Sequence, residues 1–276
     1  MLQTAPIGVF DSGYGGLTVL SEIRKILPEY DFIYLGDNAR APYGNRSFDV
    51  VYDFTLEAVN FLFSKGAPLV IIACNTASAK ALRSIQQNDL PKISSEKRVL
   101  GVIRPSTEEI GALTYTKHVG ILGTTGTIQS GSYEIELKKF APEITVTQHA
   151  CPMWVPLIEN NRHNSIAGKM FIEEDVKALM EKDPLIDTII LACTHYPVIK
   201  TYIQEILGNK VKVVAQGPIV AEKLVDYLKR HLEIECKLTK NGTIRYFTTE
   251  NNLVFNEKAS QFLEEMIHSE HVEIAN

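Results

Sequence analysis

The chain has 276 residues, of which 45% are hydrophobic and 22% are charged, so it can bury one large core or two modest ones, and disordered or collagen-like structure is excluded. Its 28 basic and 33 acidic side chains sum to a net charge of -5 without a run of basic residues, which argues against nucleic acid as a partner. The first residues lack the charged and apolar regions of an export signal, and no apolar stretch approaches the roughly 18 residues of a membrane span. We therefore expect no membrane association, and reduced thiols in a cytoplasm rather than disulfides at the widely spaced Cys74, Cys151, Cys193 and Cys236.

Short apolar runs rich in β-branched residues alternate with longer segments of helical period. This alternation is typical of βα units and predicts an α/β fold with mainly parallel sheets. Residues 198–207 show the helical period, because Ile199, Tyr202, Ile203 and Ile206 form one apolar face that should lie on a sheet. The expected strands are residues 7–10, 32–37, 69–74, 99–103, 119–124, 188–193 and 211–216.

The C-terminal part of the chain contains a turn signal between two strand-like runs. Asn241 and Gly242 lie inside the segment KLTKNGTIRYFTT, and this pair tolerates positive φ and often closes a hairpin. We expect an antiparallel edge there, followed by a helix from about Asn256 to His268.

An internal repeat indicates how the chain is divided. The segments LVIIACNTAS at 69–78 and TIILACTHYP at 188–197 each join an apolar strand, an Ala-Cys pair and a polar turn. Upstream of each lies another strand that ends in a small-residue loop, in the segments VFDSGYGG at 9–16 and ILGTTGTI at 121–128. The repeat predicts two similar parallel-sheet α/β domains related by pseudo-twofold symmetry.

The expected domain limits follow from the repeat. Residues 1–98 form a domain with Asp11 and Cys74, residues 99–208 form a domain with Cys193 and His195, and residues 209–276 return to the first domain. Ligands of open parallel sheets collect outside the carboxyl ends of the strands. The active site should therefore lie in the cleft between the domains, with Cys74 and Cys193 on opposite walls.

The two repeated cysteines are candidate acid/base groups. Either one alone is more often a buried structural residue, but both are followed by polar residues that begin helices, where backbone N–H groups and the helix dipole favour a thiolate. Cys151 and Cys236 have no counterpart in the repeat and are interpreted as structural. No cysteine or histidine spacing typical of a metal site is present.

His195 and Asp11 are candidate proton partners for the thiols. His195 lies two positions after Cys193, and imidazole exchanges protons near neutral pH. Asp11 directly follows the first expected strand, where its alternative role is to cap the helix that begins near Leu17.

The small-residue loops do not fit nucleotide binding. Thr18 stands where G-x-G-x-x-G requires glycine, and the segment GTTGT lacks the Gly-Lys-Ser/Thr of a P-loop. Instead the loops offer N–H and O–H donors that suit the carboxylate oxygens of a small anionic substrate. These candidate donors are Ser12, Asn75, Thr76, Thr124, Thr127 and Thr194.

A set of motifs, in order along nearly the whole chain, resembles the cofactor-independent aspartate/glutamate racemase family, and within it the glutamate racemases. These motifs are FDSGYGG, GDNARAPYG, ACNTAS, GTTGTI, CPMWVPLIE and ACTHYP. The resemblance implies interconversion of L- and D-glutamate, a supply of D-glutamate for peptidoglycan, and a homodimer. It implies neither a metal nor pyridoxal, so no cofactor is expected.

The resemblance also implies roles for individual residues. Cys74 and Cys193 are the acid/base thiols, with Cys74 deprotonating the D form and Cys193 the L form, and Asp11, His195 and Glu159 support them. Racemisation requires two such groups, because the planar carbanion must receive its proton on the face opposite to the one that lost it. The substrate-contacting motifs match at Asp11, Ser12, Tyr43, Gly44, Asn75, Thr76, Thr194 and His195, and with less similarity at Thr124 and Thr127.

Three departures from the family pattern occur away from the thiol turns, at Arg104, Asn38 and Gln216-Gly217. We expect them to affect peripheral, interface or effector contacts rather than the chemistry. Other functions also fit parts of the pattern: an aspartate racemase or related decarboxylase, a thiol hydrolase with Cys74 as nucleophile and His195 as base, or a non-catalytic amino-acid-binding module.

Overall fold

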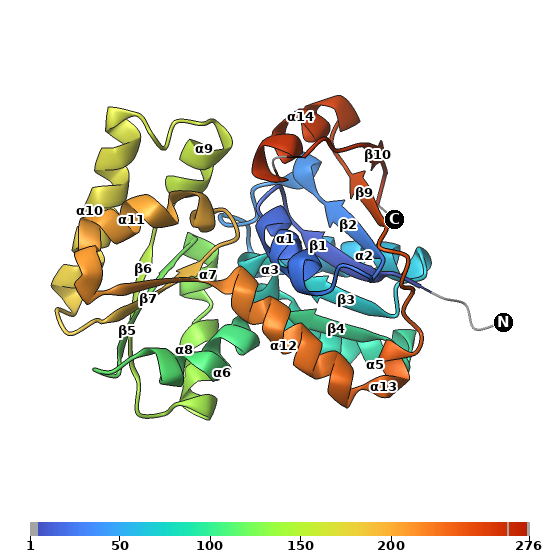
Figure 1. Cartoon of the computed structure of the whole chain (residues 1–276), viewed down its shortest axis with the longest axis horizontal. Helices are drawn as coiled ribbons and strands as arrows, with labels where there is room; N and C mark the ends of the chain where they lie inside the picture. Colours follow the sequence, from blue (N-terminus) through green and yellow to red (C-terminus); the bar gives the residue numbers. More distant parts are fainter. Residues whose placement is uncertain (1–4, 264, 275–276) are drawn as a thin grey trace.

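The computed structural model describes residues 5–263 and 265–274 and contains two parallel sheets (Figure 1). The first has the strand order β10-β9-β2-β1-β3-β4, and the second has the order β6-β5-β7-β8. All strand pairings between these elements are parallel. The expected α/β class with two parallel-sheet units is confirmed.

The first part of the chain supplies four strands of the first sheet and the helices that follow them. Its elements are β1 (Ile7–Asp11), α1 (Gly16–Ile26), β2 (Phe32–Gly36), a 3-10 turn η1 (Asn38–Arg40), α2 (Phe48–Ser64), β3 (Leu69–Ile72), α3 (Asn75–Lys80), α4 (Leu82–Ser84), a π-helical turn η2 (Ile85–Asp89), α5 (Leu90–Ile93) and β4 (Arg98–Gly101).

The middle part of the chain builds the second sheet. Its elements are α6 (Ile103–Leu113), β5 (His118–Gly123), α7 (Thr125–Gln129), α8 (Ser132–Phe140), β6 (Thr145–Ala150), α9 (Trp154–Glu159), α10 (Ile166–Lys182), β7 (Thr188–Ala192), a 3-10 turn η3 (Tyr196–Ile199), α11 (Lys200–Leu207), a 3-10 turn η4 (Gly208–Lys210) and β8 (Lys212–Ala215).

The last part of the chain returns to the first sheet. Its elements are α12 (Gln216–Arg230), α13 (Leu232–Glu235), β9 (Ile244–Thr248), α14 (Asn252–Leu263) and β10 (Ser269–His271). Helix α12 packs on α1 and so ties the end of the second sheet to the first (Figure 1).

The two sheets repeat one topology. In chain order, the strands β1 to β4 and β5 to β8 both lie in the spatial order second, first, third, fourth. Each arrangement has its switch point between its first and third strands, where the chain changes direction across the sheet. The carboxyl ends of β1 and β3 therefore correspond to those of β5 and β7.

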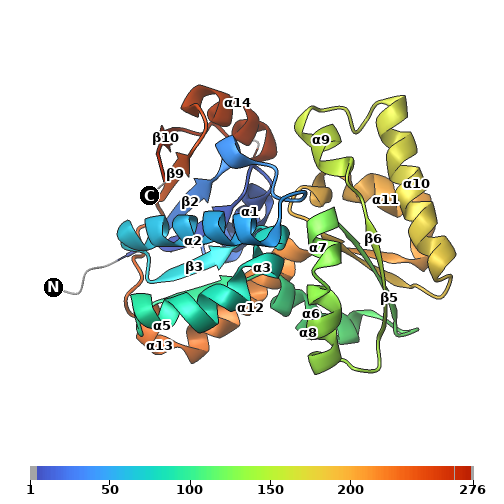
Figure 2. The same ribbon diagram turned by 180° about the vertical axis from the view of Figure 1, so that it is seen from behind.

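Apolar clusters fill both faces of each sheet, as continuous apolar strands require. In the first sheet, α1, α12 and α14 cover one face and α2 and α3 the other (Figure 2). In the second sheet, α9, α10 and α11 cover one face and α6 and α8 the other. Ile199 and Ile203 are buried there and Tyr202 packs against the same cluster, but Ile206 is exposed, so the predicted apolar helical face lies on the sheet only in part.

The strand pairing differs by a few residues from the expected domain limits. Strand β4 pairs with β3 in the first sheet although the limit was expected after residue 98, and β8 pairs with β7 in the second although the limit was expected after residue 208. That the domains themselves divide after residues 98 and 208 stays a prediction.

The expected C-terminal hairpin is wrong. Strand β9 pairs with β2 and β10 with β9, both in parallel. The turn does form, with Gly242 at φ 68, but it is fastened to the loop before β2: the Gly242 N–H donates to the Glu29 carbonyl, and the Asn241 amide donates to Asp31 at 2.7 Å. The turn therefore directs the chain along β2.

The helix expected over 256–268 is α14, which begins earlier, at Asn252, and ends at Leu263. Residue 264, which the expected helix crosses, lies outside the described residues. None of the helices over the described ranges is both long and apolar enough to cross a membrane.

Candidate active site

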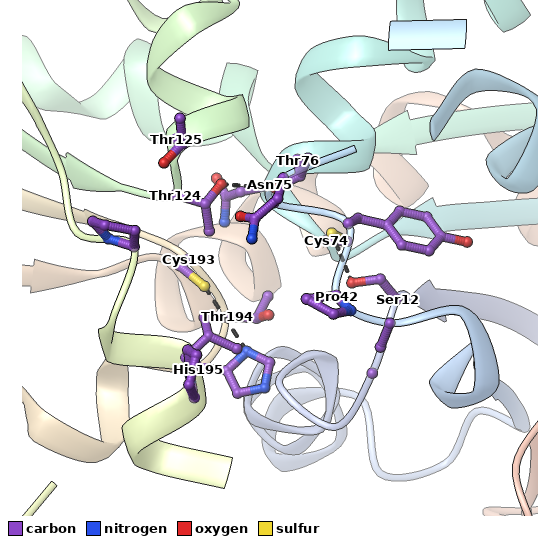
Figure 3. Close-up of a pocket in the computed structure, with 18 of the residues that line it drawn as sticks. Ser12, Pro42, Cys74, Asn75, Thr76, Thr124, Thr125, Cys193, Thr194 and His195 are labelled. Carbon is purple, nitrogen blue, oxygen red and sulfur yellow. Dashed lines mark hydrogen bonds between the residues drawn. The ribbon is translucent and has the colours of Figure 1, made fainter. Parts of the chain in front are cut away.

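Each of the two repeated cysteines lies at the carboxyl end of the third strand of its sheet. Cys74 follows β3 and is the N-cap of α3, and Cys193 follows β7. Both line one pocket between the sheets, and their sulfur atoms lie on opposite sides of it in Figure 3. Both cysteines are almost fully buried, with exposures of 6% and 7%.

Most of the residues predicted for the site line this pocket. They are Ser12, Tyr43, Gly44, Cys74, Asn75, Thr76, Thr124, Glu159, Cys193, Thr194 and His195. Two predicted residues, Asp11 and Thr127, are fully buried behind the lining. Asp11 accepts a hydrogen bond from the Thr194 hydroxyl at 3.2 Å, and the Thr127 hydroxyl lies 3.3 Å from that of Thr76.

The Cys74 sulfur is held as a thiol. Its partner is the Ser12 hydroxyl at 3.3 Å. Burial, and then the negative charge of Asp11, raise the pKa of Cys74 to about 12. The expected stabilisation of a thiolate by the backbone at the start of α3 acts in the opposite direction, but burial outweighs it.

Cys193 has a cationic neighbour. The His195 Nδ1 atom lies 3.9 Å from its sulfur, and the His195 Nε2 atom donates to Glu159 Oε1 at 2.8 Å. Burial alone lowers the pKa of His195, but the hydrogen bonds with Cys193 and Glu159 outweigh it and raise the pKa to about 10. Burial raises the pKa of Glu159, but the hydrogen bond from His195 has the larger effect, so the pKa lies below its ordinary value. The pair is therefore imidazolium and carboxylate at neutral pH, and this cation lies beside the Cys193 sulfur.

Asp11 connects the two halves of the site. Burial raises the pKa of Asp11 above its ordinary value and outweighs the charge of His195 and the hydrogen bond from the Gly13 N–H, which lower it. The N-cap of α1 is Gly15, not Asp11. Its contact with Thr194 makes Asp11 a bridge between the end of β1 and the turn after β7.

The loop that carries Tyr43 and Gly44 is anchored by residues that the sequence did not single out. The Tyr43 hydroxyl donates to the fully buried Asp37, which also pairs with Arg40 at 2.7 Å. Arg40 in turn pairs with Glu57. The carbonyl of Gly44 accepts from the N–H of Gly126 at 2.8 Å, so the loop also contacts the second half. Asp37 and Arg40 lie within the motif GDNARAPYG, but no role was predicted for them, because the motif alone does not show which side chains they contact.

The remaining cysteines differ from each other. Cys151 is buried in the core of the second sheet, as the structural interpretation predicts, but it also lines the pocket. Cys236 is exposed at the end of α13, so no core packing supports a structural role for it.

Cys151 also belongs to the group His149, Cys151 and Asp175, which offers three ligand atoms within 4.8 Å of one another. Both ring nitrogens of His149 are already engaged, with Asp175 at 2.9 Å and with Lys182 at 3.2 Å. Because lysine only donates, the ring proton lies on the nitrogen that faces Asp175. The group is therefore a hydrogen-bonded chain, with no free nitrogen for a metal.

The three departures from the family pattern have different surroundings. Arg104 is exposed on α6 and pairs with Glu108 at 2.9 Å. Asn38 accepts a hydrogen bond from Thr248 at 3.3 Å. Gln216, expected to be peripheral, is instead buried and lies 2.7 Å from the pocket residue Asn75. That expectation is wrong for Gln216, because the residue reaches the site across 141 positions of sequence.

Comparisons with known proteins agree with this geometry. The family model described as Asp/Glu/Hydantoin racemase matches residues 7–224. A glutamate racemase of Streptococcus thermophilus is 36% identical over 275 residues, which cover 99% of this chain and 97% of the relative. A crystal structure of a glutamate racemase isoform from Bacillus anthracis has a TM-score of 0.89 at 35% identity and covers 98% of both chains. One from Francisella tularensis in complex with D-glutamate has a TM-score of 0.86 at 34% identity and covers 99% of this chain and 98% of that one.

Proposed function

The chain belongs to the Asp/Glu/Hydantoin racemase family, and from that premise we propose that it is a glutamate racemase that interconverts L- and D-glutamate without a cofactor. One observation carries the proposal. Two cysteine sulfurs, each at the carboxyl end of a corresponding strand, line the same pocket from opposite sides (Figure 3). Removal of a proton from one face of a carbon and delivery to the other needs two groups in such positions.

The charges around the two sulfurs support a starting state for the reaction. Cys74 is a thiol with a pKa of about 12, and Cys193 has the His195 imidazolium beside it. In this state a Cys193 thiolate accepts the α-proton of L-glutamate and the Cys74 thiol donates its proton to the opposite face, which forms D-glutamate. The reverse reaction begins with a Cys74 thiolate and a Cys193 thiol. The family resemblance assigns the enantiomers in the same way.

The pocket suits an anionic substrate although its only cationic side chain among the described lining residues is His195. Among the described residues that line it, none is lysine or arginine, and hydroxyl and amide donors predominate. The Ser12 and Asn75 side chains can donate to carboxylate oxygens. Fixed donors also stabilise the negative charge that develops when the α-proton leaves.

The cellular role follows from the product. D-glutamate is a building block of peptidoglycan, so we infer a role in cell wall synthesis. The free thiols of Cys74, Cys151 and Cys193 fit a reducing cytoplasm. A homodimer is expected from the family resemblance alone.

The direct test follows the circular dichroism of L-glutamate and, separately, D-glutamate with purified protein and no added cofactor. In D2O, the product enantiomer should carry deuterium at the α-carbon while the remaining substrate initially keeps its protium, because different groups remove and deliver the proton. L- and D-aspartate serve as competing substrates. A protein that leaves both glutamate enantiomers unchanged would disprove the proposal.

Substitution of the thiols tests the mechanism. Cys74→Ser and Cys193→Ser should each lower kcat/KM by about 10²-fold or more, because general acid–base groups contribute on that scale. Mirror-image products have equal free energy, so the loss in kcat/KM must be equal in both directions. Cys236→Ser, at an exposed position outside the pocket, is the matched control and should retain wild-type activity. Near-normal turnover in either site variant would contradict the two-thiol assignment, and a covalent acyl adduct seen by mass spectrometry would favour a hydrolase.

A further inference from the structure

Behind the pocket, three side chains form a closed ring of hydrogen bonds. The Asn75 Nδ2 group donates to Gln216 Oε1 at 2.7 Å, the Gln216 Nε2 group donates to the Tyr133 hydroxyl at 2.7 Å, and that hydroxyl donates to Asn75 Oδ1 at 2.6 Å. All three residues are buried. Each takes part as both donor and acceptor, so the ring has one consistent direction.

The ring determines which way the Asn75 amide faces. Its oxygen accepts from Tyr133, and one of its two N–H bonds is used by Gln216. Rotation of the amide by half a turn would set oxygen against oxygen at Gln216 and leave Tyr133 without its acceptor. Burial raises the pKa of Tyr133, which keeps its hydroxyl proton in place. The second N–H of Asn75 is therefore left for the pocket, into which Asn75 points in Figure 3.

Gln216 is itself anchored from a third direction. Its Nε2 group also lies 2.8 Å from the Ser106 hydroxyl and 3.1 Å from the Val102 carbonyl, at the start of α6. The ring thus joins α3 of the first half, α8 of the second and the start of α12. It holds the two halves in one relative position directly behind the site.

We propose that Gln216 is a positioning residue for substrate binding, which acts through the ring to present an Asn75 N–H to a carboxylate oxygen of an amino dicarboxylate. The inference rests on the proposed function for the identity of that substrate. Gln216 does not line the pocket, and Asn75 is the pocket-lining residue among its side-chain partners.

The test compares steady-state constants of variants that break the ring on either side. Gln216→Leu and Tyr133→Phe should each raise KM for both enantiomers about tenfold, the loss expected for one hydrogen bond to a charged group, and should change kcat by less than KM. Ser106→Ala removes a partner of Gln216 that is outside the ring, so its KM should stay near the wild-type value. Thermal unfolding of each variant is followed in parallel, and Tyr133→Phe, which removes one oxygen atom, keeps the test valid if Gln216→Leu does not fold.

A double-mutant cycle separates positioning from a general structural role. In an Asn75→Ala background, Gln216→Leu should have no further effect on KM, because the group that it positions is gone. Additive effects, or an unchanged KM in both ring variants, would overturn the inference.

Calorimetric titration of D-glutamate into each variant gives a readout that does not depend on turnover. A protein that binds glutamate but does not racemise it would disprove the proposed function, and the loss of affinity in the ring variants would still decide the inference. A wild-type protein that neither racemises nor binds glutamate would overturn both.

Discussion

The contact between Glu159 and His195 determines the pH up to which the His195 imidazolium persists. The His195 Nε2 atom donates to Glu159 Oε1 at 2.8 Å, and its other nitrogen lies 3.9 Å from the Cys193 sulfur. In Glu159→Gln the side chain keeps its size and an acceptor oxygen but loses its charge. The variant therefore tests the charge rather than the hydrogen bond.

The expected fall in the pKa of His195 in Glu159→Gln follows from how deeply the ion pair is buried. Removal of one partner of a fully buried ion pair costs about 3–5 kcal/mol, but the Glu159 side chain is 23% exposed, so about 2–3 kcal/mol is expected here. Since one pKa unit corresponds to about 1.4 kcal/mol, the pKa of His195 should fall by roughly two. From the wild-type value of about 10, it should reach about 8 in the variant.

The pH range in which the variant loses activity follows from the raised pKa of His195. A histidine whose pKa is raised in the folded protein stays protonated until the pH exceeds that pKa. The wild-type imidazolium therefore persists to about pH 10, whereas the variant loses it above roughly pH 8. Its kcat/KM should fall modestly near neutral pH and about tenfold or more near pH 9.

The assay is the pH profile of kcat/KM for racemisation, recorded from about pH 6 to about pH 11. Glu265→Gln is the control, because Glu265 pairs with Arg24 away from the pocket and is 45% exposed. A high-pH limb at the same pH in Glu159→Gln and the wild type, or a loss of activity that does not depend on pH, would refute the reasoning.

Further predictions concern residues that support the fold and the site. Burial raises the pKa of Asp31, but hydrogen bonds from Thr243 outweigh it and lower the pKa to about 2. The stabilisation is therefore complete above about pH 4 and is lost as the pH falls through about 2. In urea titrations, Asp31→Asn should lose about 1–2 kcal/mol of unfolding free energy at neutral pH, a difference that should vanish near pH 2. In Gly15→Ala the new Cβ would lie 2.5 Å from the His195 Nδ1 atom, so kcat/KM should fall about tenfold or more while thermal denaturation shows the fold retained. Trp154 is fully buried in the core of the second sheet. In urea titrations, Trp154→Ala should therefore lower the unfolding free energy by about 3–5 kcal/mol, and Trp154→Phe by clearly less.

The sheets were predictable because their central strands are buried on both faces. Such strands are continuous apolar runs, and each of the expected runs overlaps an observed strand. Strand β6 was missed because its sequence TVTQHA is mostly polar, and its residues are only half-buried at an edge of the second sheet. An edge strand has one neighbour and tolerates polar side chains, so it lacks the apolar signal.

The C-terminal strands show what a local turn signal leaves open. Asn241 and Gly242 do make a turn, but the choice between a hairpin and a parallel addition depends on contacts with Asp31 and Glu29, about 210 positions away. A dipeptide carries no information on such partners.

The residues of the site also fall into those that could be predicted from the sequence and those that could not. Many of the pocket residues could be predicted because the repeated turns carry them, and the carboxyl ends of parallel strands meet at one edge. Tyr43, Gly44 and Glu159 lie outside these turns and were expected from the family resemblance alone. Behind the lining, Asp11 and Thr127 were predicted, but the roles of Asp37 and Gln216 were not. Asp37 and Gln216 act through buried hydrogen bonds to Tyr43 and Asn75, and their sequence neighbours give no sign of these partners.

The repeat explains why the site has two thiols, and the differences between its halves explain why the proposed reaction can start. Racemisation needs a single proton on the pair of sulfurs, because two thiols lack a base and two thiolates lack an acid. Two identical halves would not favour either arrangement. Here burial and the negative charge of Asp11 raise the pKa of Cys74, while the His195 imidazolium lies beside Cys193. In the proposed reaction from L- to D-glutamate, Cys74 gives its proton to the substrate and Cys193 takes the α-proton, so the pair ends with its one thiol on the other side of the pocket.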